Sequence, residues 1–127
     1  MPKLLSSVLA VMLLLSSAAA LAHGQPPQAV HGGQMQEANE NWVELAVSGT
    51  QVRLYVLDEA KKPVPATQVS GAASLLVGGK IYKVQLVPGN GNGLEGQLPV
   101  PASGASAATV FLKIGGQPAT ARFTFGS

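Results

Sequence analysis

The sequence contains no cysteine, so a disulfide framework, a thiolate metal site and a cysteine nucleophile are all excluded. Charged residues make up only 11% of the chain and aromatic residues only 5%. This is far from the charge-rich composition of a disordered tail, and it offers few rings for a substrate platform. Eight basic and six acidic residues leave a net charge of +2, too small a surplus for a nucleic-acid-binding protein. The 127 residues have room for one domain with one core.

Residues 1–22 have the composition of a cleaved signal peptide. Lys3 provides a basic start, residues 4–15 are apolar apart from two serines, and small residues lead to Ala-Leu-Ala at 20–22, an A-x-A cleavage pattern. The uninterrupted apolar part is too short to span about 30 Å of hydrocarbon. We therefore expect export, with a periplasm as the destination, and a processed chain that begins at His23 and has no membrane span.

Residues 42–127 show the two-residue alternation of β-strands, and residues 23–41 form an extended polar leader before them. Alternating runs joined by short glycine-containing turns predict three hairpins. The expected turns are Ser48-Gly49, Gly78-Gly79 and Gly115-Gly116. Because no helical period follows the signal peptide, we predict an all-β fold, an antiparallel immunoglobulin-like β-sandwich of seven or eight strands. A small closed barrel is the alternative.

Three features fit the alternating pattern less well. Residues 30–36 predict a short edge strand inside the polar leader. Residues 58–65 contain two prolines, which lack ladder donors, so we expect a turn there followed by an edge segment that ends at Val69. Trp42 lies opposite Val43 in the alternation, and it therefore either fills the centre of the core or covers a sheet end.

The candidate metal ligands all lie in the polar leader. His23, as the first processed residue, offers its α-amine and its ring nitrogen as a chelating pair, and His31 adds a second imidazole. Met35 supplies a thioether suited to copper(I), and Glu37 or Glu40 could complete the set with oxygen. These donors favour copper, above all copper(II). A closed structural zinc site normally requires four cysteine or histidine ligands, so this set of donors disfavours one.

Two other interpretations stay open. The two histidines and the methionine follow no fixed spacing, so they also fit ordinary surface residues on a frayed strand. A catalytic triad needs a histidine held by the scaffold, and both histidines lie in the leader, so we predict that the protein is not an enzyme. Apolar residues on nominally outward strand faces would form a partner-binding surface if they are exposed together. They are Tyr55, Leu57, Ile81, Val87 and Phe111, with Val30 as a residue that could cover them.

Three short motifs resemble those of small exported bacterial proteins. They are His-Gly-Gly at 31–33, the aromatic-led strand Trp-Val-Glu-Leu at 42–45, and Tyr-Val-Leu-Asp at 55–58 followed by Lys-Pro-Val at 62–64. The group looks like immunoglobulin-like periplasmic proteins associated with heavy-metal efflux, similar in build to copper-resistance β-sandwiches.

This resemblance implies a function in heavy-metal resistance or efflux, with copper as the ligand and envelope efflux components as partners. It points to His23, His31 and Met35 as the metal site. The single methionine of the processed chain departs from the pattern of methionine-rich copper carriers. This departure argues against a role in copper(I) transport. The alternative function is a metal-independent interaction module or an accessory subunit of an envelope complex.

Overall fold

The computed structural model describes residues 25–126, which form an all-β domain of eight antiparallel strands. The predicted fold class is thus confirmed. The expected signal peptide and His23 lie outside the described residues. Between residues 25 and 126 no helix has the length and apolar character needed to cross a membrane.

The eight strands are joined mostly by short turns, and two single-turn 3-10 helices, η3 (Ala66–Gln68) and η4 (Ala102–Gly104), precede β4 and β7. The edge strand expected at 30–36 is present but lies further along the chain, as β1. The strands are β1 (Gln34–Ala38), β2 (Asn41–Ser48), β3 (Gln51–Leu57), β4 (Val69–Val77), β5 (Lys80–Pro88), β6 (Gly93–Gln97), β7 (Ala105–Ile114) and β8 (Gln117–Thr124).

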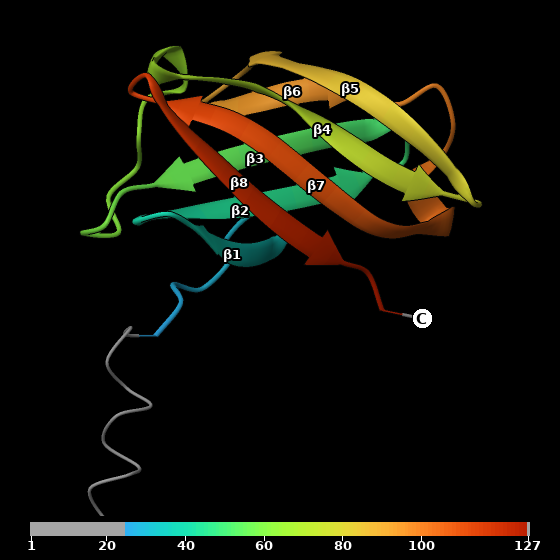
Figure 1. Ribbon diagram of the computed structural model, residues 1–127, viewed down its shortest axis with the longest axis horizontal. Helices are drawn as coiled ribbons and strands as arrows, with labels where there is room; N and C mark the ends of the chain where they lie inside the picture. The colour runs from blue at the N-terminus through green and yellow to red at the C-terminus, as the bar shows by residue number, and fades with distance from the viewer. Residues whose placement is uncertain (1–24, 127) are drawn as a thin grey trace, which may run out of the picture.

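The strands form two layers (Figure 1), which we call the A layer (β1, β2, β3 and β6) and the B layer (β4, β5, β7 and β8). Their order is β1-β2-β3-β6-β5-β4-β7-β8. Because β3 pairs with β6 and β4 with β7, two pairs of strands that are distant in sequence interlock. This Greek-key arrangement is that of an immunoglobulin-like sandwich.

The two layers are connected along one side and closed along the other. β5 pairs with β4 up to Leu86, and then with β6 through Val87 and Pro88, so it passes from one layer to the other. On the opposite side the Asn39 side-chain amide donates a hydrogen bond to the Pro118 carbonyl, between the β1-β2 turn and β8. These contacts give the sandwich some features of the closed barrel that was the alternative.

The core lies between the layers and follows the predicted alternation. Val52, Leu54 and Val56 are buried on β3, as are Ala121 and Phe123 on β8. Burying these side chains is the main favourable term for a domain of this size.

Glycine pairs set the register of two hairpins. Gly78 and Gly79 have φ angles of 57° and 82°, and Gly115 and Gly116 have the same two values. Positive φ at both central residues defines a two-residue type I′ turn, whose twist matches that of the flanking strands. Two of the three predicted hairpin turns are therefore explained by glycine alone.

The outward apolar residues do not form the single patch that the sequence analysis considered. Tyr55 and Leu57 are half-buried on β3, in the A layer, whereas Ile81 and Phe111 are exposed on the B layer. Two layers of a sandwich face opposite directions, so these residues cannot be covered together. Trp42 is half-buried at the start of β2, opposite Leu57 in the register, where it covers a sheet end rather than the core centre.

Candidate functional site

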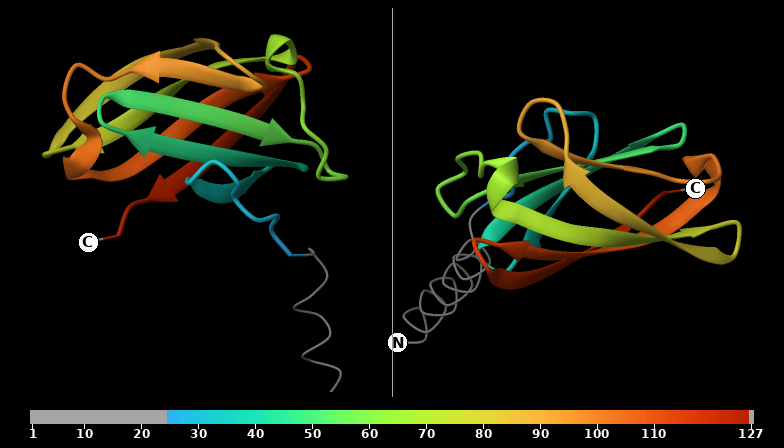
Figure 2. Two further views of the ribbon diagram at one scale, coloured as in Figure 1. Left: turned by 180° about the vertical axis from the view of Figure 1, so that it is seen from behind. Right: turned by 90° about the horizontal axis from the view of Figure 1, so that it is seen from above.

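The candidate site lies on the outer face of the A layer, beneath the segment that leads into β1. Cross-strand register places Met35, Glu44, Tyr55 and Gly93 in one row over β1, β2, β3 and β6. Residues opposite one another in an antiparallel sheet point to the same face. Seen from behind, the segment before β1 crosses over β2 (Figure 2), so part of this row is covered.

Glu44 is the centre of the site. Its side chain is only 2% exposed although it points away from the core. Its carboxylate accepts hydrogen bonds from the backbone N–H groups of Val30 (3.3 Å), His31 (2.8 Å) and Gly33 (3.0 Å). The His31 ring adds a fourth contact, with Nδ1 lying 2.9 Å from Glu44 Oε1. The carboxylate thus fixes the course of residues 30–33 over the sheet.

The conformation of residues 30–33 depends on glycine at one position in particular. A Cβ atom at Gly33 would lie 2.7 Å from the carbonyl carbon of Leu45 and 3.0 Å from the Cα of Ala46. These are main-chain atoms of β2, which cannot move aside without disturbing the sheet. Gly33 therefore lets the backbone approach closely enough to donate to Glu44.

The pKa of Glu44 reflects two opposing effects. Burial on its own raises the pKa, because it disfavours the charged form. The hydrogen bonds from the His31 side chain and from the Gly33 and His31 backbone, together with the charge of a protonated His31, act in the other direction and prevail. The pKa of Glu44 is therefore held below its ordinary value of 4.5, and the site is built around a carboxylate anion.

The His31 ring is held from a second direction by Tyr55. The two rings stack with their centroids 3.5 Å apart and their planes within 5° of parallel. Tyr55 itself lies flat over β6, since a Cβ at Gly93 would be 2.6 Å from its Cε1 atom. The missing side chain at Gly93 thus makes room for Tyr55, which in turn supports His31.

These contacts leave Nε2 of His31 as its free ring nitrogen. Among residues 25–126 it has no hydrogen-bond partner, and the side chain is 42% exposed. When Nδ1–H donates to a carboxylate, the neutral ring carries its lone pair on Nε2. Metal-binding histidines are almost always oriented in this way by a second group. The same arrangement can also accept a proton.

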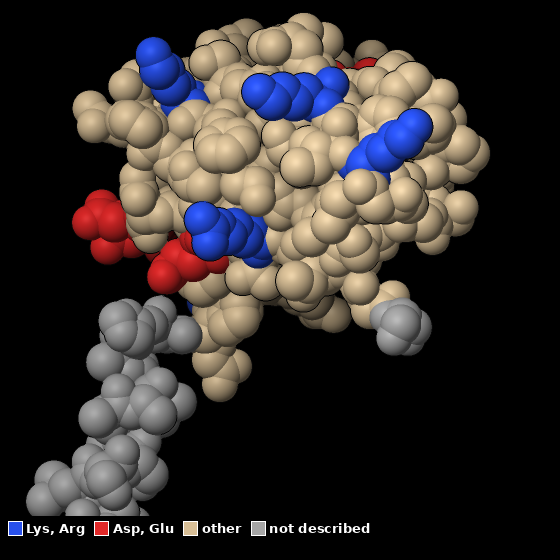
Figure 3. Space-filling model, turned by 45° about the vertical axis from the view of Figure 1, so that its right-hand side comes forward, with Lys and Arg blue, Asp and Glu red and all other residues tan. Residues whose placement is uncertain are grey.

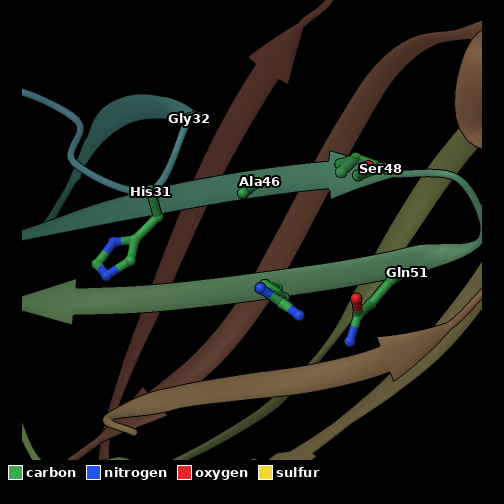
Figure 4. Close-up of a pocket in the computed structure, with 7 residues that line it drawn as sticks. His31, Gly32, Ala46, Ser48 and Gln51 are labelled. Carbon is green, nitrogen blue, oxygen red and sulfur yellow. The ribbon is translucent and has the colours of Figure 1, made fainter. Parts of the chain in front are cut away.

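A polar groove of about 420 Å³ opens beside His31. His31 stands at one end, Ala46 lies in β2 along the groove, and Ser48 and Gln51 lie at the other end (Figure 4). The exposed side chain of Arg53 also lines it. The ring nitrogens of His31 lie on the side away from Ala46, Ser48 and Gln51 (Figure 4), so the groove adjoins the side chain without facing Nε2.

The structure brings together some of the predicted ligands. His31 adjoins Glu44 directly, and Met35 is the register partner of Glu44 on β1. Glu37 is exposed and lies two residues further along β1, about 7 Å from the row of Met35, and Glu40 is exposed in the following turn. Within residues 25–126 no three His, Cys, Asp or Glu residues are close enough to hold a metal between them.

Sequence reasoning missed Glu44 and the structural role of Tyr55. Alternation correctly places Glu44 on the face opposite Val43 and Leu45, which makes it look like a solvated strand residue. A signal was nevertheless present, because a single acid in an apolar strand lies directly across the first hairpin from a tyrosine. Only the three-dimensional course of residues 30–33 shows that this acid is buried.

The pKa of Glu44 gives a pH-dependent prediction. Its charged form stabilises the folded state, so its contribution is complete above 4.5 and is lost as the pH falls through the lower pKa of the folded protein. We expect wild type to exceed the Glu44→Gln variant in unfolding free energy at pH 7, with the difference shrinking below pH 4.5. Urea unfolding from pH 7 to pH 3 measures this, and a constant difference over that range would contradict it.

Comparison with known proteins adds no assignment, since no family model, curated protein or solved structure matches the chain. Any assignment consequently depends on the chemistry of the site itself, which consists of a buried carboxylate, an imidazole with one free nitrogen and a stacked tyrosine.

Proposed function

We propose that the protein is exported to the periplasm and binds a transition-metal ion, with copper as the preferred metal, as a carrier, buffer or accessory of an efflux system. The observation that carries the proposal is the contact between His31 Nδ1 and Glu44, which leaves Nε2 free and fixed in direction. Carboxylate partners of this kind raise the basicity of a ligating imidazole and hold its orientation.

One fixed imidazole is not a complete site, and His23 supplies further nitrogen donors. If processing follows residue 22, His23 carries a free α-amine beside its ring. Eight residue steps separate it from His31, a span of up to about 26 Å when fully extended. The chain between them is therefore long enough for His23 to reach Nε2 of His31. Amine and imidazole donors together suit copper(II).

Met35 adds to the same site a ligand that suits copper(I). It is opposite Glu44 in the β1-β2 register, so it belongs to the row on which His31 lies. A thioether is a soft ligand that prefers the reduced ion. One methionine is consistent with occasional binding of copper(I). Transport of copper(I) by methionine-rich carriers uses many such residues, and this chain lacks them.

The test is titration of the processed protein with copper(II), followed by electron paramagnetic resonance. We expect the His23→Ala/His31→Gln variant to lose the nitrogen hyperfine signal and the copper affinity, while its free energy of unfolding changes by about 1 kcal/mol or less. Thr120→Ala, an exposed change on β8 of the opposite layer, is the control and should bind as wild type does. Unchanged affinity in the double variant would refute the proposal.

A metal-independent interaction module is the second candidate. It is favoured by a groove of about 310 Å³ on the other side of His31, lined by Val30, Tyr55, Leu57 and Pro63. Val30 is exposed at its edge, where an apolar group of a partner would cover it. This function predicts no copper uptake in the titration above, and a partner that is recovered from envelope fractions by wild type but not by Val30→Asp.

A further inference from the structure

The charges of the protein are divided between the two layers. The strands of the B layer contain four basic residues and no acidic residue. All six acidic residues of the chain lie in the A layer or in loops. The near-neutral total charge therefore conceals a molecule with one basic face. The basic residues are Lys80, Lys83, Lys113 and Arg122, and all are exposed. Lys83, Lys113 and Arg122 alternate with buried residues and point outward, whereas Lys80 shares the parity of Val84 and Leu86 and lies at the β4-β5 turn.

The outward basic residues are spread over the sheet rather than clustered. Lys83 and Arg122 occupy the two ends of one row across β5, β4, β7 and β8, with Ser74 and Thr109 between them. Three strand spacings separate them by about 14 Å. Figure 3 shows basic side chains spread over a mostly uncharged face, with acidic side chains along its lower left edge, one of them beside a basic side chain. The charges are thus distributed over the sheet rather than gathered around a pocket.

Exposed apolar side chains alternate with these charges. Phe111 is 53% exposed in the row next to that of Lys83, and Ile81 is 70% exposed in the row on the other side. Val87 is 55% exposed, but it lies where β5 pairs with β6 of the A layer, opposite Glu95, and so outside this surface. We call this surface the B face, defined by Lys83, Lys113 and Arg122 together with Ile81 and Phe111.

We propose that the B face docks on a membrane that contains anionic phospholipid. Lys and Arg attract negatively charged headgroups and reach them by extending their long side chains, while isolated aromatic and aliphatic side chains enter the boundary between headgroups and acyl chains. All five side chains of the B face point outward from the same sheet, so a membrane surface can contact them together. The proposal is independent of the metal site, which lies on the opposite layer and stays open to solvent when the B face is covered.

A second copy of the chain does not fit the B face. In a two-fold symmetric contact the same surface meets itself, so six basic residues would be brought together without an acidic residue of these strands to neutralise them. Charge complementarity instead requires an anionic surface. A phospholipid headgroup layer provides this charge together with an apolar interior for Phe111 and Ile81.

The experiment measures sedimentation of the exported, processed protein with vesicles of phosphatidylglycerol and phosphatidylcholine in equal parts, and with phosphatidylcholine vesicles. The test variant is Lys83→Glu/Arg122→Glu. Its control, Lys61→Glu/Lys62→Glu, makes the same change in net charge in the exposed turn after β3. Phe111→Ser tests the apolar contribution separately. Leader residues that remain after processing are the same in every variant. Differences in vesicle binding between the variants therefore report on the B face.

We expect binding to the anionic vesicles alone, a loss of at least about 30-fold for Lys83→Glu/Arg122→Glu and a much smaller loss for the control. Raising the salt from 0.1 M to 1 M should weaken wild-type binding, since the Debye length falls from about 10 Å to about 3 Å. Equal loss in both charge variants, binding to both vesicle types alike, or no binding at low salt would overturn the proposal. Capture of an acidic protein without vesicle binding would overturn it as well.

Discussion

Replacement of Glu44 by alanine is expected to lower the free energy of unfolding by about 3 kcal/mol and to release residues 30–33 from the sheet. The carboxylate accepts three backbone hydrogen bonds and contacts the His31 ring, and bonds to a charged acceptor contribute more than neutral ones. The expected loss is that of the backbone hydrogen bonds to a buried carboxylate, because the half-exposed His31 ring can turn to water.

Hydrogen exchange of the His31 and Gly33 amides measures this release directly. Both donate to the Glu44 carboxylate in wild type, so they should be protected there and exchange freely in Glu44→Ala. Glu37→Ala is the matched control, since it removes the same charge from an exposed position on β1. It should change stability by about 0.5 kcal/mol or less. Protected amides in Glu44→Ala would show that the carboxylate does not hold the loop.

The second large effect is expected from Gly33→Ala, which adds one methyl group. That group would meet the carbonyl carbon of Leu45 at 2.7 Å, so either the loop or β2 must move. We expect a loss of about 2 kcal/mol, the usual size of an overpacking penalty, and a fall in copper affinity of about 10- to 100-fold, as when the outer partner of a metal ligand is lost. Denaturant unfolding and copper titration measure the two effects.

Gly104→Ala separates this steric effect from the general cost of replacing a glycine. A Cβ at Gly104 would have its nearest neighbour at 3.7 Å, an ordinary van der Waals contact, and η4 lies outside the His31 loop. Both stability and copper affinity should stay close to those of wild type. If Gly33→Ala behaves in the same way as Gly104→Ala, the close approach at Leu45 is not what positions His31.

Much of the sandwich could be predicted because its signals are local. The Gly78-Gly79 pair forms a type I′ turn from its own backbone preference, and this turn fixes the register of the strands on either side. Alternation likewise identified Val52, Leu54 and Val56 as core residues. Each of these inferences needs only a few neighbouring residues, and tertiary structure does not override them.

The candidate site was only half predictable, because it depends on contacts between distant segments. Glu44 is buried by residues that precede it by 11 to 14 positions and have no periodic pattern. Alternation alone therefore assigns it to solvent. His31 was recognised from its chemical type, but the carboxylate that orients it and the tyrosine that supports it were not.

The B face could not be seen in the sequence for a related reason. Lys83 and Arg122 are far apart in the chain, and they share a row only because β4 and β7 lie between their strands. The strand order that brings them together includes a pairing of non-consecutive strands, and local patterns do not specify such a pairing. Net charge hides the face further, since the acids of the other layer nearly balance it.

The most direct test of the central claim, that Glu44 holds His31 with Nε2 ready to bind metal, is ¹⁵N magnetic resonance of the His31 ring during addition of copper(II). The account predicts a neutral ring protonated on Nδ1, whose Nε2 signal broadens selectively at copper concentrations well below that of the protein. A ring protonated on Nε2, or an Nε2 signal unaffected by copper, would contradict it.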